Sequence, residues 1–498
     1  FLIQIPITAL AIVTIILTIF NIPFLRRIFI TTAIFKTIIA LKFLPQISET
    51  EKAAIDSGTT WIDGELFSGK PNFKKILKEP ISELSEEEQA FLNNQVEKLC
   101  NMIDEWEYAK TKRIPNKVWD YVIQERFFSM IIPKKYGGLG FSAIANSTVN
   151  LKISSRSPGI ATLVGVPNSL GPAELLIHYG TKEQQDYYLP RLAEGKEIPC
   201  FGLTEPNAGS DAGGLQASGV LFKNEKGEIK IKLNFRKRYI TLAPLATLIG
   251  LAFKLEDPER LMGDKKDLGI TCALLKSSTA GVTIGKRHNP LNIPFPNGPI
   301  EGHNAVISIT DIIGEKEGIG RGWRMLVECL AAGRGITLPA TSTGASKMLS
   351  RVSGAYTKIR KQFGIEIGQM EGIQEPLAHI GGLNYVLEAG RKLTCSGIDK
   401  GEKPAVITAM AKYNYTETAR TLSNHAMDIL AGAAIMEGPK NLVAKSYVYM
   451  PIMITVEGAN ILTRTLMVFG QGAIRCHPYI LREVDAIESN NVKAFDKA

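Results

Sequence analysis

The chain has 498 residues, which exceeds the usual size of a single-domain core, so we expect two to four domains. Apolar residues make up 45% and charged residues 21%, a globular composition that excludes extensive disorder. The net charge of +9 is compatible with nucleic acid, an anionic membrane surface or an anionic small molecule, and does not distinguish among them. The 6 cysteines and 6 histidines are dispersed, so we expect neither a disulfide framework nor a metal site.

The N-terminal segment has no charged side chain before Arg26 and Arg27. Residues 1–25 are long enough to span a bilayer core, for which about 20 apolar residues suffice, whereas a signal peptide has a shorter apolar stretch and a basic start. Basic residues follow this run, so the positive-inside bias places the rest of the chain in the cytoplasm. Residues 28–44 suit an interfacial helix or a second membrane segment, and a buried core helix is the alternative. We assign residues 1–48 to a membrane anchor and 49–80 to a linker.

The first block after the linker, residues 81–198, has the pattern of helices. Ser85 and Glu88 have the spacing of a capping box. Apolar residues then recur at helical intervals from Phe91 to Trp106, which predicts one amphipathic helix.

The second block, residues 199–318, shows the two-residue period of strands. Ile229, Ile231, Leu233 and Phe235 alternate with polar residues. Apolar runs at 247–253, 270–275 and 305–310 indicate further strands, so we expect a small β domain.

The third block, residues 319–470, returns to helical spacing, as over residues 406–429, and predicts a helix bundle. We interpret residues 471–498 as the start of a C-terminal extension, and the absence of an initial Met suggests that residues also precede the chain. The glycine-rich run at 318–322 is not set in a strand-turn-helix unit, so we interpret it as a linker turn rather than a dinucleotide loop.

Six runs carry a more specific signal. They are MIIPKKYGGLG at 130–140, YGTKEQQDYYLPRLAEG at 179–195, FGLTEPNAGSD at 201–211, KRYITLA at 237–243, RKQFG at 360–364 and VEGANILTR at 456–464. In sequence, order and approximate spacing they resemble the acyl-CoA dehydrogenase family, over roughly residues 80–480. GITLP, MEGI and FGQGAIRCHP are most similar to its membrane-linked bacterial FadE branch. The resemblance implies an α+β fold with an N-terminal helical domain, a central β-barrel domain and a C-terminal four-helix bundle, here preceded by a membrane helix.

The resemblance implies FAD-dependent α,β-dehydrogenation of medium- to long-chain fatty acyl-CoA to trans-2-enoyl-CoA, the first step of fatty acid β-oxidation. A flavin is required because no ordinary side chain accepts a hydride. The implied partners are fatty acyl-CoA, an electron-transfer flavoprotein or respiratory-chain acceptor, membrane lipid and further copies of the chain, as a dimer or tetramer. The expected location is the bacterial inner membrane, with the catalytic part facing the cytoplasm.

The family's FAD contacts correspond to five residues. The main chain at Leu203 and the Thr204 side chain would lie near the flavin ring, with Tyr239 against it. Thr241 would hydrogen-bond near the nitrogen that receives the hydride. Arg360 would pair with the FAD pyrophosphate, often across a subunit contact, because a guanidinium binds phosphate oxygens bidentately.

Glu457 matches the family's catalytic glutamate, and a carboxylate in a water-poor cleft has a raised pKa that makes it a competent base. The family polarises the thioester carbonyl with this residue's own N–H and a flavin ribityl hydroxyl. Gly458 would give the backbone room for close approach. Arg334 matches an arginine near this site, and Ser210 matches a residue that contacts the pantetheine arm.

Each assignment has a simpler alternative. Glu457 could be a helix-capping or a solvated acid, and Arg360 a surface cation. The hydroxyls of Thr204 and Ser210 could bond the local backbone. Other positions depart from the family pattern: Tyr239, Glu371, Asp428, Ala431 with Gly432, Ala459, Ile461 and Thr463. Tryptophan is usual at the first of these, and glutamines that meet a neighbouring subunit's FAD at the next two. The departures leave the chemistry intact but count against a standard tetramer.

Three other functions remain open at this stage. An acyl-CoA oxidase would share the fold and base but pass electrons to oxygen. A nucleic-acid-binding member of the fold is disfavoured by the retained glutamate and by charges that are not gathered into a run, so we expect no nucleic-acid partner. A membrane scaffold without catalysis would hold no flavin.

Overall fold

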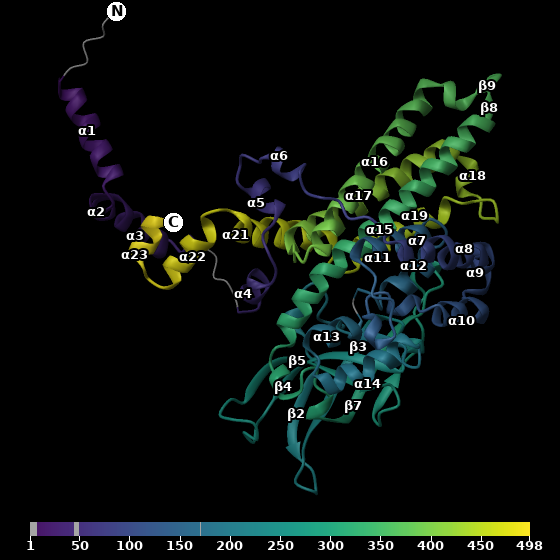
Figure 1. The fold of residues 1–498 in the computed structure, drawn as a ribbon, viewed down its shortest axis with the longest axis horizontal. Helices are drawn as coiled ribbons and strands as arrows, with labels where there is room; N and C mark the ends of the chain where they lie inside the picture. The colour runs from purple at the N-terminus through teal and green to yellow at the C-terminus, as the bar shows by residue number, and fades with distance from the viewer. Residues whose placement is uncertain (1–6, 44–48, 170) are drawn as a thin grey trace, which may run out of the picture.

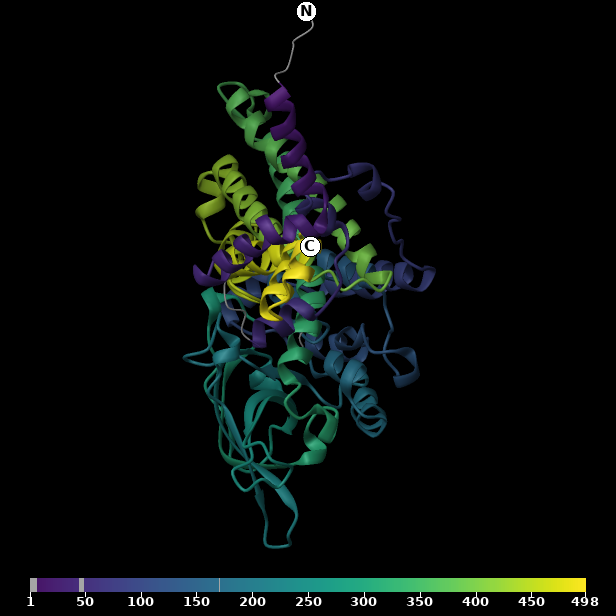
Figure 2. The same ribbon diagram turned by 90° about the vertical axis from the view of Figure 1, so that its left-hand side faces the viewer.

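Helices, a sheet and more helices follow one another along the chain in a computed structural model that describes residues 7–43, 49–169 and 171–498. Figures 1 and 2 place the sheet at one end of the molecule and the outer ends of two long helices, α15 (Gly322–Ile359) and α16 (Glu371–Asp399), at the other. The long axis of α15 therefore connects the sheet to the far end of the helical part.

A layer of helices precedes the sheet. Its elements are α7 (Glu86–Phe91), η2 (Leu92–Val96), α8 (Glu97–Met102), α9 (Glu105–Thr111), α10 (Asn116–Gln124), η3 (Phe127–Ser129), η4 (Lys134–Tyr136), α11 (Ala143–Ser154), α12 (Pro158–Gly165), α13 (Pro172–Tyr179) and α14 (Lys182–Ala193). The predicted capping box is confirmed, because Ser85 and Glu88 each accept from the other's N–H through their side chains. The single helix predicted through this region is wrong: Ile103 is extended, and Asp104 caps a new helix by accepting from the Glu107 N–H.

The sheet comprises β1 (Pro199–Gly202), β2 (Ser218–Lys223), β3 (Ile229–Thr241), β4 (Leu248–Glu256), β5 (Asp267–Lys276), β6 (Val282–Ile284) and β7 (Asn297–Ser308). Its strands run in the order β1-β4-β2-β3-β7-β6, and β5 pairs with β4. β1 and β2 pair in parallel with successive stretches of β4, and β5 takes the other edge of β4. Within the described residues this path ends at β6 without returning to its start. The sheet is therefore a half-barrel, which corrects the β-barrel that we expected for this domain.

The predicted alternation along β3 is confirmed. Ile231, Leu233 and Phe235 are buried, and the polar residues between them are exposed. The same inward register continues to Lys237, whose side chain is 0% exposed. The register therefore places a lysine inside the half-barrel.

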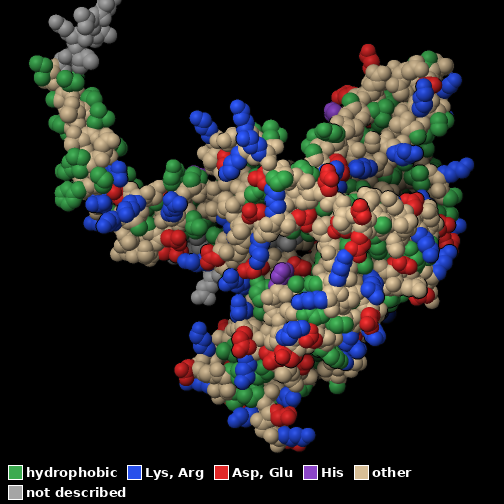
Figure 3. Space-filling model, in the orientation of Figure 1, with side chains coloured by type: hydrophobic (Ala, Val, Ile, Leu, Met, Phe, Trp, Pro, Cys, Tyr) green, Lys and Arg blue, Asp and Glu red, His purple; other side chains and the backbone are tan. Residues whose placement is uncertain are grey.

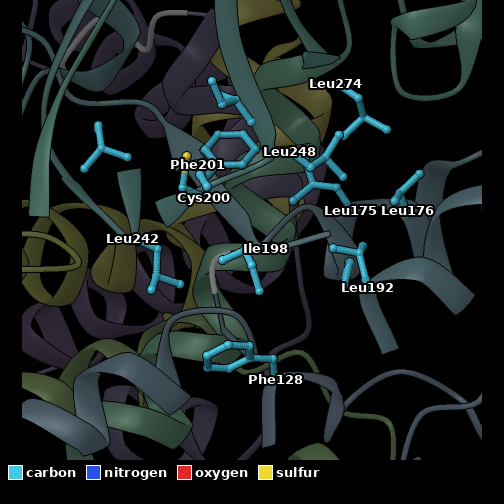
Figure 4. Close-up of a cluster of buried hydrophobic side chains, with 14 of the residues drawn as sticks. Phe128, Leu175, Leu176, Leu192, Ile198, Cys200, Phe201, Leu242, Leu248 and Leu274 are labelled. Carbon is cyan, nitrogen blue, oxygen red and sulfur yellow. The ribbon is translucent and has the colours of Figure 1, made fainter. Parts of the chain in front are cut away.

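A shared core joins the first helical layer to the sheet (Figure 4). Phe128 of η3, Leu175 of α13 and Leu192 of α14 belong to one cluster with Phe201 of β1 and Leu248 of β4. Burying each such side chain contributes roughly 1.5–3 kcal/mol. This packing fixes β1, whose last residue leads directly into the run LTEP.

The helical part after the sheet is built around α15. It further contains β8 (Lys361–Gln362), β9 (Ile365–Glu366), η10 (Ile367–Gln369), α17 (Ala405–Leu430), α18 (Gly432–Ile435), α19 (Ala444–Thr455), α20 (Asn460–Leu462), η11 (Thr463–Gln471) and α21 (Gly472–Cys476). The helix predicted over residues 406–429 is confirmed as α17. α15 packs against α11, α16 and α17, and α17 also packs against α19 and η11. The buried face of α17 therefore borders the turn between α19 and α20.

The segment that we interpreted as a linker contains α4 (Glu49–Asp56), α5 (Ile62–Phe67) and α6 (Phe73–Ile76). α4 contacts α15, and α5 contacts α17 and α21. Ile55 and Ile62 are buried by this packing, and the Trp323 indole N–H donates to the Thr50 carbonyl at 2.8 Å. This segment is therefore packed on the C-terminal helices.

An arm stands away from the rest of the molecule (Figure 1). It consists of α1 (Ile7–Asn21), α2 (Pro23–Arg26), η1 (Arg27–Thr31) and α3 (Thr32–Ala40), with α22 (Ile480–Glu488) and α23 (Val492–Lys497). The Asp496 carboxylate, 1% exposed, accepts from Arg26 Nε at 2.9 Å and from Thr31 Oγ1 at 2.6 Å. The Phe495 ring packs edge-on against Phe35, with 5.4 Å between centroids. The two ends of the described chain therefore form one unit.

The arm exposes apolar side chains along its length and carries basic side chains at its base (Figure 3). No single helix of the described residues is long and apolar enough to span a membrane. Ile7–Asn21 with Pro23–Ala40 passes that test only as a pair bent by 89°, and Ala444–Thr455 with Asn460–Cys476 as a pair bent by 51°. The single membrane helix that we predicted is thus not found there, and residues 1–6 of the predicted anchor lie outside the described residues.

Candidate active site

Glu457 lies in the turn between α19 and α20, in an unusual backbone conformation. Its φ is 54° and that of Gly458 is 90°, so both residues occupy the left-handed region. Such a φ costs a residue with a side chain roughly 1–3 kcal/mol and persists only where the surroundings enforce it. Arg334 of α15, which is 9% exposed, supplies one such restraint by donating from Nε to the Glu457 carbonyl at 2.7 Å.

The Glu457 carboxylate has few partners. Ser169 Oγ donates to Oε1 over 3.5 Å, and Oε2 is buried without any hydrogen-bond partner among the described residues. Burial raises the pKa of this carboxyl above its ordinary value, against the attraction of the Arg334 and Lys412 cations. A buried carboxylate with one free oxygen and a raised pKa is suited to accepting a proton.

Glu457, Gly458 and Arg334 are therefore brought together as predicted from the sequence. A Cβ on Gly458 would lie 3.2 Å from Thr463 Oγ1 and 3.8 Å from Arg334 Nη2. Glycine at this position thus serves both the positive φ and the close approach.

A cavity of about 140 Å³ borders this group. Its lining includes Ser169 and Gly333, which lie beside the Glu457 carboxylate and Arg334, together with Phe141, Asn146 and Ile336. The Ser169 hydroxyl therefore lies between the cavity and the carboxylate.

The second group of predicted residues lies on the sheet. The Leu203 carbonyl accepts from the buried Lys237 ammonium at 3.1 Å, and the Thr204 carbonyl accepts from the Arg238 N–H at 3.0 Å. These bonds tie the segment after β1 to the end of β3. Leu203 and Thr204 are half-buried, so their outer edge remains accessible.

A bulge near the end of β3 turns the Tyr239 side chain outward. The β3–β7 register shifts between Lys237 and Ile240, and Tyr239 has a φ of 60°. Bulges of this kind redirect side chains, and the Tyr239 side chain is 58% exposed. Asn297 Nδ2 donates to the Tyr239 carbonyl at 2.9 Å and approaches Thr241 Oγ1 at 3.4 Å. The sheet thus places Leu203 and Thr204, after β1, beside the end of β3 that carries Tyr239 and Thr241.

Two predicted residues lie elsewhere. Ser210 is exposed in the turn before β2, where Asp211 accepts from the Gly214 N–H. Arg360 is exposed at the C-terminal end of α15, 26 residues beyond Arg334, or about 39 Å along the helix at 1.5 Å per residue. Arg360 is therefore too far from the Glu457 group of its own chain to serve the same site, and it would reach such a site only in another copy of the chain.

Glu371 and Asp428, which depart from the family pattern, are also exposed. Ala431 ends α17 with a φ of 47°, where a double glycine was expected. Among the described residues, no group of three or more His, Cys, Asp or Glu side chains is placed to hold a metal ion.

Two buried lysines were missed from the sequence. Lys237 is 0% exposed and pairs with Glu205 at 2.6 Å. Its place in the inward register of β3 was a signal that could have identified it. Lys412 of α17 is also 0% exposed and lies four residues from both Thr408 and Thr416, which are buried as well. A lysine within such a stripe requires buried acceptors.

Comparisons with known proteins identify the family. Three family models match: Acyl-CoA dehydrogenase, N-terminal domain over residues 80–196, middle domain over 200–302 and C-terminal domain over 320–468. The chain is 33% identical to a 3-(aryl)acrylate reductase of Clostridium sporogenes over 348 residues, which cover 69% of this chain and 85% of that protein. It is 28% identical to the very long-chain specific acyl-CoA dehydrogenase of Mus musculus, covering 79% of this chain and 59% of that protein.

The fold is similar to that of butyryl-CoA dehydrogenase from Megasphaera elsdenii. The TM-score is 0.68 at 23% identity, over 78% of this chain and 98% of that one. The family models, the relative that is 33% identical and this shared fold together show that the chain belongs to the acyl-CoA dehydrogenase family of flavin-dependent oxidoreductases acting on CH–CH groups.

Proposed function

We propose that this protein removes hydrogen from the α and β carbons of medium- to long-chain fatty acyl-CoA, giving the trans-2-enoyl-CoA, with Glu457 as the base. The observation that carries the proposal is the Glu457 carboxylate, with Oε2 buried, unpartnered among the described residues and held on a turn fixed by Arg334. A base in this state takes the α-proton without first breaking an existing hydrogen bond.

The residues on the sheet fit a flavin. Tyr239 is 58% exposed, with the Arg238 guanidinium 4.7 Å from its ring centroid, so it leaves an aromatic surface accessible to a flavin. Thr241 Oγ1 accepts from Asn297 and can still donate outward. Leu203, Thr204, Tyr239 and Thr241 would therefore hold the ring of FAD, and Arg360 of another copy its pyrophosphate. FAD supplies the hydride acceptor for the β carbon when it is bound.

This chain's own groups account for the proton side of the reaction. The Glu457 N–H makes no hydrogen bond to the described backbone, so it is free to bind the thioester carbonyl oxygen and acidify the α carbon. Oε2 then takes the α-proton. Burial favours the protonated carboxyl that results, which is consistent with the raised pKa of Glu457.

The medium- to long-chain substrate is favoured by the FadE-like runs and by the very long-chain specific relative. The relative named 3-(aryl)acrylate reductase suggests a competing class, an aryl-substituted acyl group. Electrons would leave to an electron-transfer flavoprotein or a respiratory-chain acceptor. The match covers only 59% of the mouse relative, so parts of that protein that have no counterpart here could contribute to its partner binding.

We also propose that the arm holds the protein on the cytoplasmic face of the bacterial inner membrane. Exposed apolar residues of the arm, including Val13, Phe20 and Phe29, would enter the lipid. Sedimentation with vesicles containing anionic lipid tests this, and protein that stays in the supernatant contradicts it.

An anaerobic titration with palmitoyl-CoA, followed by flavin bleaching, tests the reaction. Wild type should bleach, whereas Glu457→Gln should bind flavin and substrate without bleaching. Glu259→Gln, in an exposed turn, is the matched control and should behave as wild type. If Glu457→Gln bleaches as fast as wild type, Glu457 is not the base.

The same titration distinguishes the substrates. Faster bleaching by 3-phenylpropanoyl-CoA than by palmitoyl-CoA would replace the fatty-acyl substrate with an aryl one. Rapid peroxide formation in air would indicate an oxidase instead.

A further inference from the structure

Lys412 of α17 carries a fully buried ammonium group. Its Nζ donates to Gly458 O at 2.7 Å, to Ile454 O at 3.3 Å and to Asn460 Oδ1 at 2.6 Å. The side chain is 0% exposed. An ammonium has three donors, so all of its hydrogen-bonding capacity is directed at this one loop.

The three acceptors surround the proposed base. Ile454 lies in the last turn of α19, Gly458 directly follows Glu457, and Asn460 begins α20. Lys412 therefore holds both sides of the turn at Glu457. Arg334 of α15 donates to the carbonyl of Glu457 itself at 2.7 Å. Two buried cations, Arg334 and Lys412, on two different helices therefore bond to this short segment.

Asn460 extends the restraint back to α17. Its Nδ2 donates to Thr416 Oγ1 at 3.0 Å and to Glu417 Oε1 at 2.8 Å. Asn460 is thus bonded to three residues of α17, which fixes the chain shortly after Glu457.

Lys412 also acts on the Glu457 carboxylate through its charge. The ammonium favours the ionised carboxylate and opposes the effect of burial, as Arg334 of α15 does. Burial in turn lowers the pKa of Lys412 to about 8, with Glu457 and Glu417 opposing and Arg334 adding to that shift. Tyr449 of α19 is the further titratable group near this carboxylate, and burial raises its pKa to about 12, so it stays neutral.

We propose that Lys412 is a positioning residue for the dehydrogenation, which fixes the turn that aims the Glu457 carboxylate and tunes the ionisation of that carboxylate by its charge. The inference rests on the proposed function, because it assigns to Lys412 an effect on the base. A purely structural lysine would support folding but would leave the pH dependence of the reaction unchanged.

The variants Lys412→Met, Lys412→Gln and Lys412→Arg separate the two roles. Lys412→Met removes the donors and the charge, Lys412→Gln keeps one donor group without charge, and Lys412→Arg keeps the charge. Lys265→Met, in an exposed loop, is the matched control. Flavin content, thermal midpoint and the rate of anaerobic bleaching by palmitoyl-CoA are measured for each from pH 5.5 to 9.

For Lys412→Met we expect retained flavin and a bleaching rate lower by about 100-fold, because small misplacements of a catalytic group have effects of this size. The acid limb of the rate profile should move upward by about one pH unit in Lys412→Met and Lys412→Gln, because the nearby cation is lost. Lys412→Arg should return the limb to its wild-type position.

An unchanged acid limb in Lys412→Gln overturns the proposal, and it does so even if Lys412→Met fails to fold. A lower thermal midpoint with a wild-type rate per bound flavin also overturns it, because the lysine is then structural only. Wild-type bleaching reports separately on the proposed function. If wild type does not bleach, both proposals fail, whereas wild-type bleaching with an unaltered variant removes the Lys412 proposal alone.

Discussion

Replacing Lys237 by methionine should leave the Glu205 carboxylate buried without its cation. The two side chains are 0% and 3% exposed and lie 2.6 Å apart. Glu205 also accepts from the N–H groups of Gln216 at 2.5 Å and Ala217 at 3.0 Å. Although burial opposes it, the Lys237 ammonium, with these N–H groups, holds the pKa of Glu205 below its ordinary value. Without the ammonium only the two N–H groups oppose the effect of burial, so the carboxylate must either stay charged in a buried site or take up a proton, and both destabilise the fold.

The cost follows from this burial. Removing one partner of a buried ion pair typically destabilises a protein by about 3–5 kcal/mol, since the remaining charge is uncompensated. The Leu203 carbonyl would lose a hydrogen bond as well, worth about 1 kcal/mol. At about 2 °C per kcal/mol for a unit of this size, Lys237→Met should lower the thermal midpoint by about 8–12 °C.

The double variant Lys237→Met with Glu205→Gln removes both charges. Its amide oxygen replaces one of the two carboxylate oxygens, which accept separately from the Gln216 and Ala217 N–H groups, so one of those bonds is retained. The double variant should recover at least about 2 kcal/mol relative to Lys237→Met, because no buried charge remains. Scanning calorimetry of the flavin-loaded proteins measures the midpoints, and flavin content reports on the Leu203 segment. A double variant that is destabilised by the full sum of the single effects would refute the reasoning.

Three further predictions concern the base and the arm. Gly458→Ala should lower stability by about 1–2 kcal/mol and should also lower the bleaching rate. Gly227→Ala, at a φ of 77° but with open space around it, should lower stability alone. Calorimetry and anaerobic bleaching distinguish the two variants. Burial raises the pKa of Glu457 in the folded state, so the folded protein loses stability as pH rises and this carboxyl ionises. Glu457→Gln should therefore melt at a higher temperature than wild type at pH 8, and this difference should disappear near pH 4.5. Thermal scans between these pH values test the sign. Asp496→Asn should weaken the contact with the N-terminal part of the arm and speed limited proteolysis near α23, whereas exposed Asp264→Asn should not; equal cleavage of both variants would contradict this.

Local sequence patterns predicted those elements whose structure depends on interactions between residues close together in the chain. The capping box at Ser85 and the alternation along β3 depend on neighbours in the sequence, and both are confirmed. The break at Ile103 was missed because the apolar period continues through it, while Asp104 offers a competing cap. The half-barrel could not be predicted, because closure depends on which strand takes each edge of β4.

The site shows the same division. The run around Glu457 led us to propose this residue as the base. The positive φ of Glu457 cannot be inferred from its type, because glutamate is not a residue that favours this region. The bulge that exposes Tyr239 was missed for the same reason. Both conformations are enforced by contacts from distant parts of the chain, including Arg334 on Glu457 and Asn297 on Tyr239.

The two buried lysines explain how this chain tolerates strain where its function requires it. Lys237 binds the segment after β1 through the Leu203 carbonyl and the Glu205 carboxylate. Lys412 binds the turn at Glu457 through two main-chain carbonyls and the side-chain oxygen of Asn460. An ammonium that is satisfied by carbonyl groups of one segment fixes the backbone of that segment, which an apolar side chain of the same volume would not do. Burying each charge has a cost, and a sequence selected for stability alone would avoid it. Their presence beside both halves of the candidate active site therefore indicates that backbone geometry, more than side-chain identity, distinguishes these segments from ordinary turns.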